Sequence, residues 1–250
     1  MILGIIPARY SSSRFPGKPL AEIEGVSMIQ RVYSCASQSK HLSKIVVATD
    51  DERIFNHVKG FGGEVLMTGM EHPSGTDRCN EVLSLSSGDY NYVINIQGDE
   101  PFLDPQQIDE LAIHCNGDNE LITQMIPVND YETLFDTGEV KITLNSSQEA
   151  LYFSRSVIPF LKGIPQQEWH LNHTYYRHVG MYAYRSDVLE KISLLKPSSL
   201  EISESLEQLR WLEAGFTIKC VETKFDSYCV DFPEDIDKIL NWKKNIKKEI

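Results

Sequence analysis

A chain of 250 residues with 41% hydrophobic and 24% charged residues is typical of a folded, soluble protein with a substantial core. Its net charge of -12 argues against nonspecific binding to nucleic acid or to an anionic membrane. Its apolar runs are too short to span a membrane, and its five widely spaced cysteines contain no Cys-x-x-Cys, which favours reduced thiols in a cytoplasm.

The first predicted element is a buried strand over residues 2–6, which stops at Pro7. The loop that follows has three cations, hydroxyls at 11–13 and no acidic residue before Glu22. Open α/β sheets bind anionic ligands at the carboxyl ends of their strands, so a nucleotide-triphosphate loop is predicted here. The loop lacks the spacing of a P-loop, and a solvated surface turn is the alternative. The cations are Arg9, Arg14 and Lys18.

Strands and helices alternate through the first half of the chain. Each apolar run of strand length is followed by a segment with apolar residues at helical spacing. This order predicts an α/β fold with a three-layer, mostly parallel sheet. The strands are expected at 2–6, 44–48, 64–67 and 92–96, and the helices at 27–39, around 54–58, at 76–85 and at 105–114.

The pattern changes near residue 139, where a smaller mixed β/α subdomain is predicted. Two alternating runs with a turn between them indicate an antiparallel hairpin, and a polar, irregular segment is a candidate mobile loop. The hairpin is expected at 140–144 and 150–154, the loop at 163–174, further strands at 179–184 and 217–221, and helices at 203–214 and 233–248.

Two aspartates follow separate predicted strands. Asp99 comes directly after the strand at 92–96, and a buried carboxylate needs a partner such as Mg²⁺. Asp231 stands just before the last helix. Taken alone, Asp99 fits a capping residue in a turn and Asp231 an N-cap followed by Pro233. Together with the cationic loop, they fit metal-dependent transfer at phosphorus.

Other polar residues near element ends have two interpretations each. The loop at 72–78 has hydroxyls, a glycine and a cation that could surround a base and ribose, or it caps the next helix through Ser74 or Thr76. Arg155, His178 and the pair 207–208 are consistent with binding of an acidic, hydroxylated ligand, and each alone is equally a surface or packing residue.

Seven motifs in the same order along the chain resemble the 3-deoxy-manno-octulosonate cytidylyltransferases, or CMP-Kdo synthetases. The first three are Ile-Pro-Ala-Arg-Tyr-x-Ser-x-Arg-x-Pro-Gly-Lys-Pro-Leu, Ser-Gly-Thr-Asp-Arg and Gln-Gly-Asp-Glu-Pro. The first and third occur loosely in other sugar-nucleotide cytidylyltransferases, whereas the later motifs are typical of the Kdo branch. The motifs lie at 6–20, 74–78, 97–101, 150–155, 178–182, 205–210 and 230–235.

The resemblance implies the nucleotide-diphospho-sugar transferase fold and the formation of CMP-Kdo and pyrophosphate from CTP and Kdo, an acidic eight-carbon sugar. It also implies Mg²⁺ as cofactor, a homodimer, and a role in lipopolysaccharide biosynthesis in a Gram-negative cytoplasm, without a nucleic-acid or membrane partner. The implied divisions are a nucleotide-binding core over 1–138, a sugar-binding and dimerisation subdomain over 139–225, and a metal-ligand segment with a closing helix over 226–250.

The resemblance also implies a role for particular residues. Those with catalytic roles are Arg9, Lys18, Asp99 and Asp231, of which Asp99 and Asp231 hold the metal. Nucleotide binding falls to Pro7, Ala8, Arg9, Arg14, Lys18, Ser74, Gly75, Arg78 and Gln97. Sugar binding falls to Arg155, His178, Tyr182, Glu207 and Gln208.

The chain departs from the family pattern beside one proposed metal ligand. The family commonly has Gly-Val-Asp-Thr-Pro-Glu-Asp, whereas here Cys229 replaces the glycine and Phe232 the threonine. The change leaves the metal role of Asp231 in place. It leaves open which sugar the protein prefers: Kdo, the 8-amino analogue of Kdo or another sugar acid. A nucleotide-binding regulatory protein without turnover is the alternative. Retention of both aspartates and all three loop cations argues against it.

Overall fold

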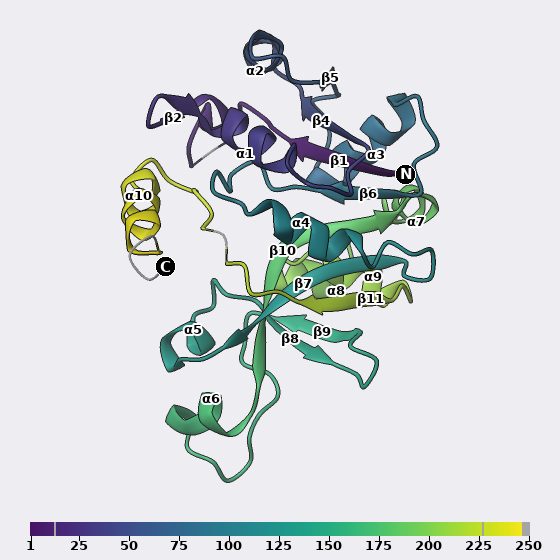
Figure 1. Ribbon diagram of the computed structural model, residues 1–250. Coiled ribbons are helices and arrows are strands. Elements are labelled where there is room, and N and C mark those ends of the chain that lie inside the picture. The colour runs from purple at the N-terminus through teal and green to yellow at the C-terminus, as the bar shows by residue number, and fades with distance from the viewer. Residues whose placement is uncertain (13, 227, 247–250) are drawn as a thin grey trace. The chain divides into compact units, whose positions relative to one another are not determined.

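The computed structural model describes residues 1–12, 14–226 and 228–246 (Figure 1). The chain forms two compact units. The first contains Met1–Asp109 and the chain from Phe225 onward, and the second contains Glu110–Lys224. The functional division at residues 138 and 225 stays a prediction.

The first unit contains a sheet of parallel strands. Its order is β6-β1-β4-β5, with β1 (Ile2–Pro7) paired to β4 (Lys44–Thr49) on one side and to β6 (Tyr92–Asn95) on the other, and β5 (Val65–Met67) at one edge. These strands are apolar because a parallel sheet is covered on both faces. Leu3, Ile5 and Ile6 of β1 are fully buried. The predicted parallel α/β sheet is confirmed.

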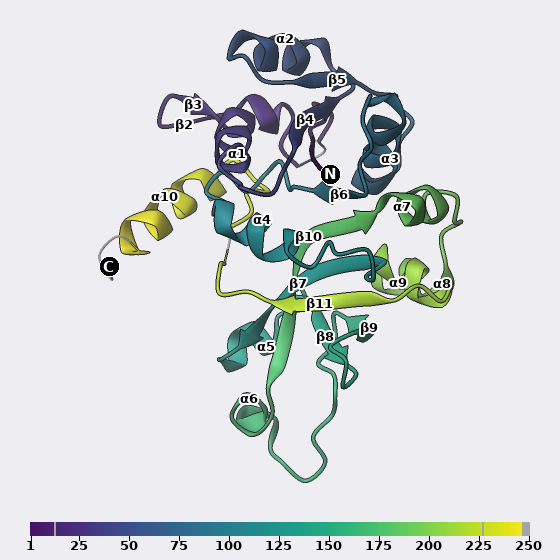
Figure 2. The same cartoon turned by 45° about the vertical axis from the view of Figure 1, so that its right-hand side comes forward.

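Helices connect these strands and cover the sheet. They are α1 (Met28–Ala36), α2 (Glu52–Gly60) and α3 (Gly75–Leu85), while α4 (Pro105–Ala112) follows β6 and leads to the second unit. Side chains cap three of them as their residue types predict: Ser27 accepts from Gln30 N, Asp51 from Arg53 N and Ser74 from Asp77 N. In Figure 2, α1 and α3 lie on opposite sides of this sheet, which gives the unit its three layers.

The strand order places a crevice between β1 and β6. From β1 the chain moves outward through β4 to β5, and it then returns to the other side of β1 to form β6. The connections on the two sides of β1 therefore run in opposite directions. In open α/β sheets, ligands bind beyond the carboxyl ends of the strands at such a switch point. The loops after β1 and β6 are the two loops that contain the predicted phosphate-binding cations and Asp99.

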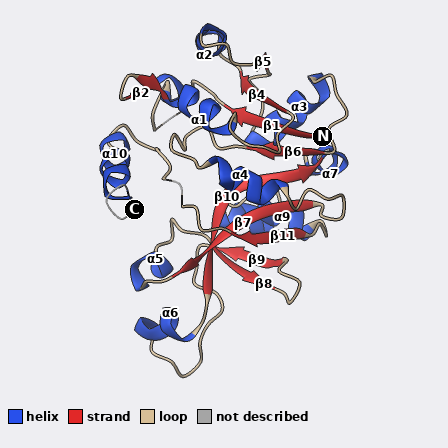
Figure 3. Cartoon of the chain, viewed as in Figure 1, coloured by secondary structure: helices blue, strands red, loops and turns tan. Residues whose placement is uncertain are grey.

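The second unit is built around β10 (Tyr175–Arg185). This strand pairs antiparallel with β7 (Leu121–Val128), which in turn pairs parallel with β11 (Ile218–Glu222). The predicted hairpin is present as β8 (Lys141–Leu144) and β9 (Ala150–Ser154), seen side by side in Figure 3. The β10 register shifts between Val179 and Tyr182, the signature of a bulge that re-aims side chains.

Several elements differ from the sequence expectation. The helix expected at 203–214 is two helices, α8 (Ser199–Glu204) and α9 (Gln208–Glu213), because Ser205 adopts a left-handed conformation with φ 53°. The segment expected to be irregular, 163–174, contains η2 (Gln166–Glu168) and α6 (Trp169–Asn172), with the Trp169 side chain buried. The last helix, α10, is Asp235–Ile246 and begins later than Pro233; residues 247 and 248 lie outside the described part of the chain.

The sequence predicts no element between 115 and 138, where the structure has β7 and a short helix. No helix in the described residues has the length and apolar character needed to cross a membrane. The remaining short elements are η1 (Lys18–Leu20), β2 (Glu22–Ile23), β3 (Val26–Ser27), α5 (Tyr131–Phe135) and α7 (Ser186–Ile192).

Candidate active site

The loops after β1 and β6 approach each other closely at Gly98. A Cβ atom on this residue would lie 2.7 Å from the carbonyl oxygen of Pro7, which is closer than real Cβ contacts allow. A residue without a side chain is therefore required where the Gln97-Gly98-Asp99 turn passes the end of β1. This contact places Asp99 directly beside the cationic loop.

The cationic loop is closed by its own backbone. Gly17 N donates to Tyr10 O at 2.9 Å, and Gly17 adopts a left-handed conformation with φ 73°. The Tyr10 ring lies against Gly17, and the guanidinium of Arg53 lies over that ring at 3.3 Å from its centroid. The chain then enters η1, of which Lys18 is the first residue. Of the predicted hydroxyls at 11–13, Ser13 lies outside the described residues.

The Lys18 ammonium lies between the two predicted carboxylates. Its Nζ donates to Asp99 Oδ2 at 2.6 Å and to Val230 O at 2.9 Å, and it lies 3.5 Å from Asp231 Oδ1. Arg14 Nη1 donates to the other oxygen of Asp231 at 2.9 Å. The expected meeting of both carboxylates with the cationic turn is therefore observed, while the catalytic and metal-binding roles of these residues stay predictions.

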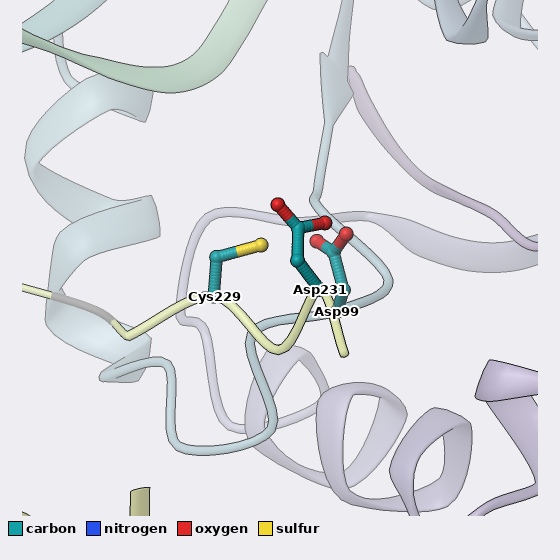
Figure 4. Close-up of side chains that lie close together, drawn as sticks. All are labelled: Asp99, Cys229 and Asp231. Atoms are coloured by element: carbon teal, nitrogen blue, oxygen red, sulfur yellow. The ribbon is translucent and has the colours of Figure 1, made fainter. Parts of the chain in front are cut away.

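The segment before α10 is held in register by one backbone bond. Val230 N donates to Asp99 O at 2.9 Å, and the Val230 side chain is fully buried in a cluster with Ile23, Met28 and Ile239. Since side chains alternate along an extended segment, Cys229 and Asp231 emerge on the side opposite to Val230. Figure 4 shows the side chains of Asp99, Cys229 and Asp231 close together.

Asp231 does not cap the last helix. Asp235, the first residue of α10, reaches back along the chain: its Oδ2 accepts from the backbone N of Asp231 at 3.0 Å and of Phe232 at 2.9 Å. The Asp231 carboxylate is thereby left to pair with Arg14 and Lys18. The simple capping interpretation of Asp231 is wrong.

Electrostatics in this cluster keep Lys18 charged. Desolvation by burial acts to lower the pKa of Lys18, but the charge and hydrogen bond of Asp99 outweigh it, and the pKa is raised above its ordinary value. For the Cys229 thiol, desolvation and the nearby charges of Asp99 and Asp231 raise the pKa. Cys229 is an exposed residue, and its sulfur lies within 4.8 Å of an oxygen of each carboxylate.

A cavity of about 180 Å³ adjoins this cluster. Its lining includes six of the nine predicted nucleotide-binding residues and Asp99. Arg9 and Arg14 are both exposed, but Arg9 differs from the other two cations because it forms no ion pair within the described part of the chain. It is therefore available to an anionic ligand. The lining residues are Pro7, Ala8, Arg9, Ser12, Arg14, Lys18, Pro19, Gln97, Gly98 and Asp99.

The other three nucleotide candidates, Ser74, Gly75 and Arg78, are not in that lining. Gly75 lies against Pro7 at the start of α3, while Ser74 caps the helix as one interpretation expected. Arg78 is buried and donates to Thr68 Oγ1 and, at 2.9 Å, to Asp50 Oδ2. Its guanidinium thus has a structural partner in the first unit, and its part in nucleotide binding stays a prediction.

Two of the five sugar-binding candidates meet on β10. The rings of His178 and Tyr182 lie 5.2 Å apart, and His178 Nε2 is 2.9 Å from Thr123 Oγ1. Desolvation, assisted by the positive charge of Arg177, lowers the pKa of His178 to about 3, so the imidazole is neutral at pH 7. Burial likewise raises the pKa of Tyr182, which keeps its hydroxyl protonated.

The remaining sugar candidates lie in the same unit. Arg155 Nε donates to Glu204 O at 2.8 Å and its Nη1 to Thr137 O at 3.0 Å, so this guanidinium is held by carbonyls. Glu207 and Gln208 begin α9, whose Trp211 packs edge-on against Tyr182 at 5.2 Å. A second cavity, of about 460 Å³, is lined in the same unit by residues between Ile142 and Tyr176 and by none of the five candidates.

Three residues of these sites could not be singled out from the sequence. Thr123 lies on β7, where no strand is predicted, although Leu121–Val128 is an apolar run that could have signalled one. Glu204, which accepts from Ser154 Oγ and Arg155 N, has no local signature. Cys229 was noted only as a departure from the family pattern, and its place beside both carboxylates depends on the bond between Val230 and Asp99.

Comparison with known proteins gives the family. The model of the cytidylyltransferase family matches residues 3–225. The 3-deoxy-manno-octulosonate cytidylyltransferase of Cytophaga hutchinsonii is 48% identical over 96% of both chains. The 8-amino-3,8-dideoxy-manno-octulosonate cytidylyltransferase of Shewanella halifaxensis is 46% identical over 93% of this chain and 94% of its own. A solved structure of CMP:2-keto-3-deoxy-manno-octonic acid synthetase complexed with CTP has a TM-score of 0.89 and 38% identity, and covers 100% of this chain and 99% of that one.

The chain belongs to the cytidylyltransferase family, in the branch of the 3-deoxy-manno-octulosonate cytidylyltransferases. The resemblance inferred from the seven motifs is thus confirmed, and the chain is a nucleotidyltransferase. The predicted fold class is confirmed by the same structural match.

Proposed function

We propose that this chain joins CTP and 3-deoxy-manno-octulosonate to form CMP-Kdo and pyrophosphate. The observation that carries the proposal is the meeting of Lys18 with the carboxylates of Asp99 and Asp231 beside a cavity lined by Arg9 and Arg14. The names of the relatives and the CTP bound to the solved neighbour support the two substrates. The activated sugar acid would serve lipopolysaccharide biosynthesis.

The reaction exchanges one bond at phosphorus for another. The anomeric hydroxyl of the sugar attacks the α-phosphorus of CTP in line, pyrophosphate leaves with the electron pair of the bond that breaks, and the hydroxyl proton passes to solvent. Catalysis of this kind depends on positioning and on cations placed where negative charge develops. Arg9, without an ion pair in the described structure, and Lys18 are placed to contact the triphosphate and the leaving group.

The nucleotide would lie at the switch point. The backbone at Pro7 and Ala8, with Gln97, lines the cavity and is suited to contact cytosine and ribose. Gly75 at the start of α3 lies beside Pro7, and Gly75 together with the N-cap Ser74 would extend the same surface. Arg78, paired with Asp50, would act by holding this loop in place.

The donor atoms at the site fit a divalent cation. The carboxylates of Asp99 and Asp231 supply hard oxygens, and they already accommodate the Lys18 ammonium at 2.6 and 3.5 Å. Asp99 and Asp231 would hold Mg²⁺, which supplies positive charge to the reacting oxygens when bound. Asp99 and Asp231 would position the ion, and the charge and hydrogen bond of Asp99 keep the neighbouring Lys18 protonated.

The sugar would be bound by the second unit. Arg155 can offer a guanidinium to the sugar carboxylate, while the neutral His178 and the protonated Tyr182 can exchange hydrogen bonds with hydroxyls. Glu207 and Gln208 would add an acceptor and an amide. The 8-amino analogue is the second candidate substrate, because the Shewanella halifaxensis relative is nearly as similar as the others.

We propose in addition that the chain acts in the cytoplasm as a homodimer joined through the second unit. The large apolar side chains of Leu151, Phe160 and Leu171 in that unit are exposed in the single chain. Burial of such side chains is what stabilises a dimer. Light scattering on the purified protein would test the expected two-chain mass, and a one-chain mass would contradict it.

The activity is tested by pyrophosphate release from CTP and Mg²⁺ with Kdo, with 8-amino-Kdo and without sugar. We expect release that depends on Kdo, with CMP-Kdo as the product. Faster release with the 8-amino sugar would move the assignment to that substrate. Binding of CTP without release with either sugar would instead indicate a nucleotide-binding regulatory protein.

A further inference from the structure

Cys229 lies in the same group of donor atoms as the two carboxylates. Its sulfur and oxygens of Asp99 and Asp231 all lie within 4.8 Å of one another, and this is the one such group of three found among the described residues. The three side chains face a common space in Figure 4. The backbone that carries them is held in register by the buried Val230 side chain and by the bond from Val230 N to Asp99 O.

We propose that Cys229 is a metal ligand, and that Asp99, Asp231 and Cys229 together bind a divalent cation of borderline softness, of the class of Zn²⁺ and Co²⁺. The proposal rests on the metal site of the proposed function and assigns it a sulfur donor. Mg²⁺ is a hard ion that binds through oxygen, so sulfur contributes little to its affinity. Zn²⁺ and Co²⁺ accept thiolate, imidazole and carboxylate ligands alike. Cys229 therefore changes which ions the site prefers.

The distances permit this coordination. A Zn²⁺ ion has bonds of about 2.3 Å to sulfur and about 2.0–2.2 Å to carboxylate oxygen, so its tetrahedral donors stand about 3.5 Å apart. Donor atoms within 4.8 Å reach that separation by rotation of their side chains. Three protein ligands leave the fourth position open, as in zinc sites that bind a further ligand.

The surrounding charges also favour a cation here. The Lys18 ammonium is already within 2.6 Å of Asp99 and 3.5 Å of Asp231, which is independent evidence that this space accommodates positive charge. As the sulfur binds the ion, the thiol proton passes to solvent. Two carboxylates, one thiolate and a divalent ion then carry a net charge of about -1 by formal count, which the adjacent Lys18 offsets.

The test is titration of the full-length protein with Co²⁺ alone, followed by absorption spectroscopy. A bond between thiolate and Co²⁺ gives a charge-transfer band in the near ultraviolet that oxygen ligands do not give. We expect this band in the wild type and in Cys35→Ser, a control thiol on α1, and its loss in Cys229→Ser and Cys229→Gly. Since loss of even an outer partner lowers metal affinity about 10–100-fold, Co²⁺ and Zn²⁺ should bind both variants at least about tenfold more weakly.

The outcomes separate this proposal from the function on which it rests. Co²⁺ binding without a sulfur band in the wild type would overturn the role of Cys229 and leave a carboxylate site for Mg²⁺. Equal losses of Mg²⁺ and Co²⁺ affinity in both Cys229 variants would show a merely structural role and also overturn it. Wild-type affinity for both ions in Asp99→Asn would remove the carboxylate site itself. Two substitutions of Cys229, each checked by circular dichroism, prevent a folding defect from imitating a lost ligand.

Discussion

The two candidate regions use opposite electrostatics. In the first unit, Lys18, Arg14, Asp99 and Asp231 are charged and paired at 2.6 to 3.5 Å. In the second, desolvation keeps the imidazole of His178 neutral, and the ring packs among aromatic side chains. The first region is therefore built from paired charges, whereas His178 and Tyr182 of the second offer neutral hydrogen-bonding groups in the same unit as the charged Arg155 and Glu207.

This difference follows from what each region is proposed to hold. A triphosphate carries several negative charges. Before it binds, the cations of its site need counter-ions. The carboxylates of Asp99 and Asp231 fill that need and hold Lys18 in place. The sugar's carboxylate is proposed for Arg155, whereas its hydroxyls carry no charge and are suited to donors and acceptors that keep one protonation state, such as His178 and Tyr182. Removal of one charge, one contact or one neutral group at a time tests this difference between the two regions.

The largest effect is expected for Asp99→Asn. The change keeps the size of the side chain but removes the negative charge that pairs with Lys18 and is proposed to hold the metal. We expect pyrophosphate release to fall by about a thousandfold, at the upper end of losses for one group aimed at the reacting charge. Asp89→Asn, at an exposed aspartate of the same unit, is the matched control. Near-normal turnover in Asp99→Asn, with unchanged circular dichroism, would remove Asp99 from the metal site.

Lys18→Ala should have the next largest effect. Loss of the ammonium removes a charge-assisted donor to the phosphates and leaves the two carboxylates facing each other. We expect turnover to fall by about a hundredfold with the sugar KM little changed. Lys40→Ala, at an exposed lysine, controls for the loss of a positive charge. A change confined to the sugar KM would show that the phosphate assignment of Lys18 is wrong.

Gly98→Ala tests the packing that brings the two loops together. The added Cβ would lie 2.7 Å from the Pro7 carbonyl, so the turn has to shift. We expect the free energy of unfolding to fall by about 1–3 kcal/mol, the usual cost of an overpacked methyl group, and the CTP KM to rise. Gly60→Ala is the control, because a Cβ at Gly60 meets no atom within 4 Å. Equal stability of the two variants in denaturant unfolding would show that the close approach is not a constraint.

The parts of the site that the sequence predicts are those with local signals. Asp99 follows an apolar strand directly, and Arg9, Arg14 and Lys18 share one acid-free loop, so the residues themselves mark a strand end with polar chemistry. Parallel strands then bring such loops to one edge of the sheet, which is why Asp99 and Lys18 were expected to meet.

The parts that were missed depend on contacts between distant residues. The motif of Arg78 does not predict its buried contacts with Asp50 and Thr68, which come from other loops, while its part in nucleotide binding stays a prediction. The break between α8 and α9 at Ser205 is a left-handed residue that is not glycine, and residue type does not predict it. Thr123 is a polar residue inside β7, and its contact with His178 exists only once β7 and β10 pair.

The smallest effect, and the clearest test of the neutral region, is the pH dependence of stability through His178. Its pKa is lowered to about 3 in the folded chain, against an ordinary value of about 6.5 in the unfolded chain. Between these values the unfolded state binds more protons, so His178 lowers stability progressively as the pH falls below about 6.5. Since one pKa unit corresponds to about 1.4 kcal/mol, the loss between pH 7 and pH 5 should be at most roughly 2 kcal/mol. In His178→Gln this part of the loss should disappear from denaturant unfolding curves, whereas His41→Gln, at an exposed histidine, should keep the wild-type dependence. If His178→Gln kept it as well, the pKa of His178 would have to be the same in the folded and the unfolded chain, and the imidazole would not be held neutral by burial.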